Sequence, residues 1–143
     1  LDTDQFAIDL EDTGNVLRSR SDCTDKVGVM GFCLGGKFTY LSAVRHNIQA
    51  AVSYYGVEID KYLDEVESIG CPLLMHFAEN DPHVPAPSVD QIRDALQPNG
   101  LADIHVYPGT EHGFNRYGYP PHHEAQAIAA RKRTIEHFRR HLA

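Results

Sequence analysis

The chain has 143 residues, of which 13 are lysine or arginine and 20 are aspartate or glutamate, giving a formal net charge of −7 with neutral histidines. This acidic balance argues against electrostatic attraction to nucleic acid or anionic membranes, and no apolar run approaches the roughly 20 residues of a membrane span. With nucleic acid and membranes disfavoured as partners, we expect the protein to act on a small molecule. The three cysteines are an odd number, which argues against a disulfide framework, and we expect a cytoplasmic location.

Helix-like and strand-like segments alternate along the chain. Short apolar runs bounded by turn residues predict strands at 27–32, 50–55, 73–78 and 104–107. Apolar residues at helical spacing predict helices at 3–18, 34–45, 59–66, 88–96 and 122–142, and Ser88 with Gln91 has the spacing of a capping box. Continuous apolar runs are typical of parallel strands buried on both faces. We therefore expect an α/β fold, a parallel sheet flanked by helices, as one domain over residues 1–143.

One cysteine stands between a predicted strand and a predicted helix, in the segment Gly31-Phe32-Cys33-Leu34-Gly35-Gly36. Gly31 and Gly35 suit a tight turn in which the backbone comes too close for side chains. A thiol at a helix N-terminus is favoured as the thiolate, and the Leu34 N–H can donate to an oxyanion on an attacked carbonyl. The pattern predicts a nucleophile elbow, and the alternative is a buried structural cysteine at a glycine-rich turn.

An acid and a base follow this cysteine in the order that a catalytic triad requires. Asp81 lies in Glu79-Asn80-Asp81-Pro82-His83-Val84-Pro85, and His112 lies in Glu111-His112-Gly113-Phe114. Both come after the carboxyl end of a predicted strand, as Cys33 does, and these ends share one rim of a parallel sheet. The order nucleophile, acid, histidine is that of α/β-hydrolases. We therefore predict a Cys33-Asp81-His112 triad.

These motifs resemble the dienelactone hydrolase (carboxymethylenebutenolidase) family, whose elbow reads G-[FY]-C-x-G-G, whose acid segment reads G-x-x-D-x-x-[VI]-P, and whose histidine block reads H-[GS]-F. Ala78 stands here where the family's acid segment has glycine. The resemblance implies the C-terminal part of an α/β-hydrolase, without the N-terminal portion that holds a second oxyanion N–H, a glutamate and an arginine. Arg116 matches the family's arginine that binds a substrate carboxylate, a role that suits a guanidinium; an exposed surface arginine is the alternative.

The implied function is a hydrolase that cleaves a lactone or ester through an acyl-thioester on Cys33, with no metal or organic cofactor. Two alternatives stay open: a broad carboxylesterase, thioesterase or acyltransferase of the same fold, and a truncated, non-catalytic module that pairs through its sheet edge. If upstream strands are missing, the strand at 27–32 presents an apolar edge. We expect a separate N-terminal fragment, an exchanged segment or a second copy to fill it.

The other histidines are interpreted by their positions in the pattern. His76 falls inside a predicted buried strand, whereas His105 alternates with apolar neighbours and is expected to be exposed. His83, close to Asp81, is either a pocket residue or an ordinary loop residue. The adjacent pair His122-His123 suggests a solvated helix start rather than a metal site, because neighbouring side chains point in different directions.

Overall fold

The computed structural model describes residues 2–143 and contains a four-stranded sheet with the order β1-β2-β3-β4. The strands are β1 (Gly28–Phe32), β2 (Ala50–Tyr54), β3 (Leu73–Ala78) and β4 (Ala102–Tyr107). Every neighbouring pair is parallel, so each connection crosses over a face of the sheet. This arrangement confirms the predicted α/β fold with a parallel sheet.

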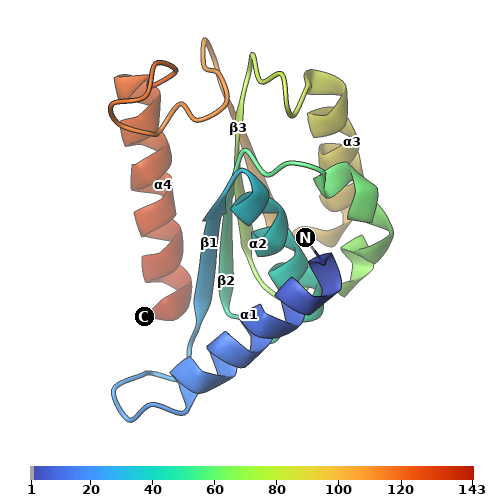
Figure 1. Ribbon diagram of the computed structural model, residues 1–143, viewed down its shortest axis with the longest axis vertical. Coiled ribbons are helices and arrows are strands. Elements are labelled where there is room, and N and C mark those ends of the chain that lie inside the picture. Colours follow the sequence, from blue (N-terminus) through green and yellow to red (C-terminus); the bar gives the residue numbers. More distant parts are fainter. Residues whose placement is uncertain (1) are drawn as a thin grey trace.

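Helices cover both faces of the sheet. They are α1 (Thr3–Arg18), α2 (Leu34–Arg45), α3 (Ala86–Leu96) and α4 (Glu124–Leu142), with 3₁₀ helices η1 (Ile59–Ser68) and η2 (Gln97–Asn99). Figure 1 shows α4 alone on one face and α1, α2 and α3 on the other. Within residues 2–143, no helix combines the length and the apolar character that crossing a membrane demands.

Most predicted boundaries agree with the structure, but the predicted capping box is wrong. α3 begins at Ala86 with Pro85 as its N-cap residue, so Ser88 lies inside the first turn and makes no cap. The early start has a physical reason, since a proline in the first helical turn forfeits no backbone hydrogen bond. The segment predicted as a helix at 59–66 is 3₁₀, and Tyr62 interrupts it with a φ of −126°.

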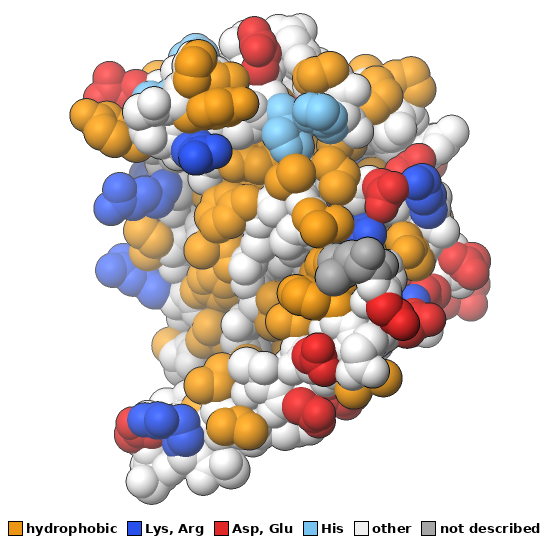
Figure 2. Space-filling view, viewed as in Figure 1, with side chains coloured by type: hydrophobic (Ala, Val, Ile, Leu, Met, Phe, Trp, Pro, Cys, Tyr) orange, Lys and Arg blue, Asp and Glu red, His pale blue; other side chains and the backbone are white. Residues whose placement is uncertain are grey.

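The two central strands, β2 and β3, are more deeply buried than the edge strand β1. Every residue of β2 and of β3 is buried, as expected for parallel strands covered on both faces. β1 lies at the edge of the sheet, where Met30 is 49% exposed and Phe32 is 41% exposed. Figure 2 shows hydrophobic side chains gathered in a band between α4 and the helices of the opposite face. Among the described residues, β1 pairs with β2 on one side only, and proteins normally cover an apolar edge strand whose other side is unpaired.

Candidate active site

The backbone at Cys33 has the strained geometry of a nucleophile elbow. Its φ of 54° and ψ of −116° place a non-glycine residue on the unfavourable side of backbone space, directly between β1 and α2. A Cβ atom at Gly31 would collide with the backbone of Gly35, which confirms why glycine is needed at that position. The expectation for Gly35 was wrong, because a Cβ there would meet nothing within 4 Å. The second close approach is instead at Gly36, where a Cβ would lie 2.6 Å from the Cα of Gly56.

Backbone hydrogen bonds tie the elbow to the loop that follows β2. The Cys33 N–H donates to the carbonyl oxygen of Tyr54 at 3.0 Å, and the Val57 N–H donates to the carbonyl oxygen of Cys33 at 3.3 Å. Tyr55 and Glu58 in the same loop also have positive φ values, of 37° and 59°. The elbow and this loop therefore form one strained, mutually supported unit at the rim of the sheet.

Asp81 and His112 form a hydrogen-bonded pair. The Nδ1 of His112 lies 2.8 Å from Oδ2 of Asp81, whose carboxylate also accepts from the N–H groups of His83 at 2.8 Å and Val84 at 3.2 Å. Burial acts to raise the pKa of Asp81, but the hydrogen bonds from His112 and from the two N–H groups outweigh it and lower the pKa. The ionised carboxylate fixes the proton on Nδ1, which leaves Nε2 of His112 as the basic nitrogen.

Two aromatic rings hold the imidazole of His112 in place. The ring of Tyr55 packs at 4.6 Å between centroids, and the ring of His83 packs at 4.8 Å. Tyr55 is itself fixed, because its hydroxyl donates to Oδ1 of Asn115 at 2.5 Å. Sequence reasoning left the role of His83 open and missed that of Tyr55. The available signal was the Tyr54-Tyr55-Gly56 run at the carboxyl end of a strand.

Cys33 and His112 line the same cavity, which has a volume of about 510 Å³. The lining residues are Cys33, Leu34, Val57, Glu58, His83 and His112. Within residues 2–143, no hydrogen bond joins the thiol to the imidazole, although the Asp81 pair holds the imidazole at the cavity wall. Leu34 opens α2, so its N–H is one of the groups that a helix N-terminus leaves free to donate.

Arg116 lies outside this cavity. It is exposed, and its guanidinium stacks 5.0 Å above the ring of Tyr119 on the loop that follows His112. Its predicted contact with a substrate carboxylate stays a prediction. The side chain of His123 caps α4 by accepting from the Gln126 N–H at 3.5 Å, which agrees with the helix start expected there. In the described part of the chain, no group of three or more histidine, cysteine or acidic residues is arranged to hold a metal ion.

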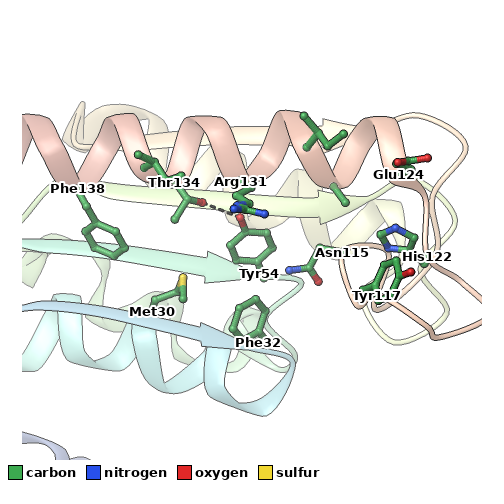
Figure 3. A pocket seen from close by; sticks show the side chains of 13 residues that line it. Met30, Phe32, Tyr54, Asn115, Tyr117, His122, Glu124, Arg131, Thr134 and Phe138 are labelled. Atoms are coloured by element: carbon green, nitrogen blue, oxygen red, sulfur yellow. Dashed lines mark hydrogen bonds between the residues drawn. The ribbon is translucent and has the colours of Figure 1, made fainter.

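A larger groove of about 650 Å³ runs between β1 and α4. Figure 3 shows Met30 and Phe32 from β1, Tyr54 from β2 and Phe138 from α4 along this groove. Asn115, His122 and Glu124 line its polar end. None of the predicted triad residues lines it, so this groove is separate from the cavity that Cys33 and His112 share.

Comparison with known proteins places these features in a family context. The sequence profile of the dienelactone hydrolase family matches residues 2–142. A carboxymethylenebutenolidase of Pseudomonas putida is 34% identical over 128 residues, which cover 90% of this chain and 54% of that protein. An Azospirillum brasilense protein assigned to the same activity is 40% identical over 109 residues, which cover 76% of this chain and 47% of that protein.

A crystal structure from Klebsiella pneumoniae, assigned as a dienelactone hydrolase, superposes with a TM-score of 0.87 at 26% identity. The match covers 96% of this chain and 61% of the other, and it identifies the parallel sheet as part of an α/β-hydrolase fold. The chain spans about half the length of the curated relatives it matches.

Proposed function

Since the chain belongs to the dienelactone hydrolase family, we propose that it acts in the hydrolysis of a lactone or ester through Cys33, His112 and Asp81. The observation that carries the proposal is the shared cavity: a cysteine on a strained elbow and a histidine bound to a buried aspartate line one space. A nucleophile, a base and a group that orients the base are the parts that covalent acyl transfer needs.

The proposed reaction has two halves. Nε2 of His112 takes the thiol proton, and the sulfur of Cys33 attacks the carbonyl carbon while the Leu34 N–H donates to the developing oxyanion. The carbon–oxygen bond to the leaving group then breaks, His112 returns the proton to that group, and an acyl-thioester remains. In the second half, water loses a proton to His112 and attacks the thioester carbonyl carbon; the carbon–sulfur bond then breaks, the acid is released, and His112 returns the proton to the sulfur of Cys33.

The nucleophile favours esters with good leaving groups. A thiolate leaves more readily than most alkoxides, so the first tetrahedral intermediate goes forward chiefly when the substrate's own leaving group is stabilised, as in enol esters and enol-lactones. We therefore propose lactones of this type over simple esters and amides. A broad carboxylesterase, thioesterase or acyltransferase is the second candidate, and the ratio of rates on enol-lactones, alkyl esters and thioesters separates the two.

Arg116 is our candidate for recognition of a substrate carboxylate. It lies on the loop that carries His112, four residues after that histidine, and a guanidinium can bind a carboxylate with two parallel hydrogen bonds. We expect Arg116→Ala to raise KM for a carboxylate-bearing lactone and to leave KM for a neutral ester unchanged. Equal changes for both substrates would contradict the assignment.

We also propose that another strand of polypeptide covers the edge of β1 and the groove beside α4. Relatives of this chain are about twice as long as the matched region, so their unmatched portion is long enough to supply such a strand. The exposed side chains of Met30 and Phe32 mark the surface it would cover. All three cysteines are free thiols, which fits the cytoplasmic location that we propose.

Acylation by an activated ester tests the nucleophile directly. We expect p-nitrophenyl acetate to leave an acetyl group on the protein, seen by intact mass spectrometry after a rapid acid quench. Cys33→Ala removes the adduct, whereas Cys23→Ala, which removes another free thiol, keeps it. An adduct that persists in Cys33→Ala, or that never forms on the wild-type chain, would contradict the proposed nucleophile.

A further inference from the structure

Tyr55, the residue after β2, has a backbone conformation that costs free energy. Its φ of 37° lies in the left-handed region, which a residue with a Cβ adopts only at a cost, and its side chain is buried. The surrounding structure holds it there, since its N–H donates to the carbonyl oxygen of His76 at 2.6 Å. Strain of this kind gathers at functional sites, where the rest of the fold enforces it. The side chain of Tyr55 is therefore a candidate for a functional role.

The ring of Tyr55 packs on the imidazole of His112, with 4.6 Å between centroids and 57° between the ring planes. The hydrogen bond from Nδ1 to Asp81 fixes one atom of that imidazole, but one bond alone leaves the ring free to change its tilt. A general base works only when its nitrogen stays within reach of the proton that it takes. His83 also packs on the imidazole, but His83 is exposed, so Tyr55 is the more firmly fixed neighbour.

A hydrogen bond to Asn115 holds the far end of the Tyr55 ring. The hydroxyl of Tyr55 donates to Oδ1 of Asn115 at 2.5 Å. Burial, with smaller contributions from Cys33 and other nearby groups, raises the pKa of Tyr55, so the hydroxyl stays protonated and remains a donor. Asn115 lies three residues after His112 on the same loop. The bond therefore joins the loop after β2 to the loop that carries the proposed base.

Packing anchors the same loop independently of this hydrogen bond. Phe114, between His112 and Asn115 in the chain, has no exposed surface. Its ring packs against Tyr107 at 5.0 Å and against Tyr55 at 5.9 Å between centroids. The apolar contact of Phe114 keeps the loop on the sheet, whereas the directed bond of Asn115 holds the hydroxyl of Tyr55. Removal of the Asn115 amide therefore leaves the packing of the loop in place.

We infer that Asn115 and Tyr55 are positioning residues, whose hydrogen bond keeps the Tyr55 ring against His112 and so limits the orientations of the imidazole. The inference rests on the proposed function, in which that imidazole takes the proton of Cys33. Asp81 selects which nitrogen is basic, and the Tyr55–Asn115 pair sets how firmly the ring is held. Asn115 also lines the groove between β1 and α4, so the link runs from the wall of the groove to the wall of the cavity.

The test is the single-turnover rate at which p-nitrophenyl acetate acetylates Cys33, followed as release of p-nitrophenolate over a range of ester concentrations. Asn115→Ala and Tyr55→Phe are each expected to lower the limiting rate about tenfold, a part of the roughly 10²–10⁴-fold contribution of a well-placed base. Neither side chain lines the cavity, so the ester concentration that gives half the limiting rate is expected to change by less than about twofold.

Three further variants separate positioning from a general loss of structure. Tyr40→Phe is the matched control: it removes a buried hydroxyl that donates to the carbonyl oxygen of Tyr62 at 3.0 Å, and neither residue lines the cavity. Asn115→Asp keeps an oxygen acceptor in a side chain of the same size and is expected to restore the rate. The double variant of Tyr55→Phe with Asn115→Ala is expected to lose no more than either alone, because all three lack the same bond. Thermal unfolding checks that each variant is folded.

The outcomes also separate this inference from the proposed function. If the wild-type chain is not acetylated at Cys33, the proposed function is overturned, and the positioning role with it. If Cys33 is acetylated but Asn115→Ala and Tyr55→Phe react as fast as Tyr40→Phe, or if their losses multiply in the double variant, the positioning role alone is overturned. Similar losses in the limiting rate, restored by Asn115→Asp and absent from Tyr40→Phe, support it.

Discussion

Two histidine-centred networks lie at different depths of the same sheet. At the rim, His112 bonds to Asp81 through Nδ1 at 2.8 Å and borders the cavity that contains Cys33. In the interior, His76 lies on β3 with no exposed surface. Its Nδ1 lies 2.8 Å from the hydroxyl of Tyr107 and its Nε2 lies 3.1 Å from the hydroxyl of Thr134. Both histidines have hydrogen-bond partners, but His112 lines the cavity that contains Cys33, whereas His76 lines neither that cavity nor the groove between β1 and α4.

The two histidines differ in how many of their ring nitrogens form hydrogen bonds within the protein: both nitrogens in His76, and Nδ1 in His112. Thr134 donates its hydroxyl proton to the carbonyl of Ala130, so it accepts from Nε2 of His76, and Nδ1 then accepts from Tyr107. Burial, with smaller effects of nearby charges, lowers the pKa of His76 to about 3. His76 is thus neutral and fully bonded, a stabilising group. His112 has no protein partner for Nε2 within residues 2–143, which leaves that nitrogen available for proton transfer.

The largest expected effect is on turnover when the rim histidine is removed. His112→Ala deletes the proposed base, so kcat/KM for an activated ester is expected to fall by about 10²–10⁴-fold, the usual contribution of general acid–base catalysis. Steady-state kinetics measure the loss, and urea unfolding is expected to show a much smaller change. Turnover within a few-fold of the wild type would contradict the proposed role of His112.

Removal of the interior histidine is expected to have the converse effect. His76→Phe keeps a ring of similar shape but leaves the hydroxyls of Tyr107 and Thr134 without their imidazole partner. We expect a loss of about 1–3 kcal/mol in the free energy of unfolding, the cost of unsatisfied buried polar groups. Activity below the unfolding transition is expected to stay near the wild-type level. A catalytic loss without destabilisation would show that the two networks are coupled.

The low pKa of His76 predicts a specific loss of stability in acid. The folded state keeps this imidazole neutral down to about pH 3, whereas the unfolded chain binds a proton near its ordinary pKa of 6.5. Stability from this group is therefore complete above pH 6.5 and is lost as the pH falls toward 3, by up to about 1.4 kcal/mol per pH unit.

Urea unfolding at pH 7, 6 and 5 measures this slope, and His76→Phe serves as the reference chain. His46 and His137 also have pKa values lowered by burial, and they contribute in the same direction in both chains. The wild type is thus expected to lose more stability than His76→Phe over this range. Parallel curves for the two chains would contradict the assignment of His76 as a buried neutral group.

The sequence predicts the fold well because the hydrophobic pattern of each segment agrees with the place of that segment in a parallel sheet flanked by helices. Apolar runs of strand length, separated by helical periodicity, indicated the parallel sheet, and each element is found within a few residues of its predicted range. The positions of Cys33, Asp81 and His112 after strand ends predicted their common rim, since connectivity alone brings these ends together. The hydrogen bond between Asp81 and His112 agrees with that prediction.

Other features depend on packing that no local pattern encodes. The glycine required beside the elbow is Gly36 rather than Gly35, because the close neighbour is Gly56, a residue from another strand's loop. The pairing of Lys37 with Glu58 likewise joins α2 to the loop after β2, and neither residue lies in a recognisable motif. The substrate contact of Arg116, suggested by its match to a family motif, stays a prediction, and the stacking of its side chain on Tyr119 is a contact that the sequence did not indicate.

The smallest expected effect on stability concerns the open edge of β1. Met30→Lys places a charge on an already exposed side chain, so the free energy of unfolding is expected to change by less than about 0.5 kcal/mol. The groove itself should respond clearly, because Met30 lines it: the chain alone is expected to bind an apolar dye such as ANS, and Met30→Lys to weaken that binding. Val16→Lys, at an exposed apolar residue of α1 outside the groove, is the matched control.

Particle mass from light scattering shows which polypeptide covers this edge. If the proposed cover comes from the unmatched portion of the longer relatives, the 143-residue chain alone remains a particle of 16.0 kDa with its groove open to the dye. A particle of twice that mass, which Met30→Lys dissociates and Val16→Lys does not, would show that a second copy covers the edge. The rim network would then be unaffected in either case, since the triad residues lie outside the groove.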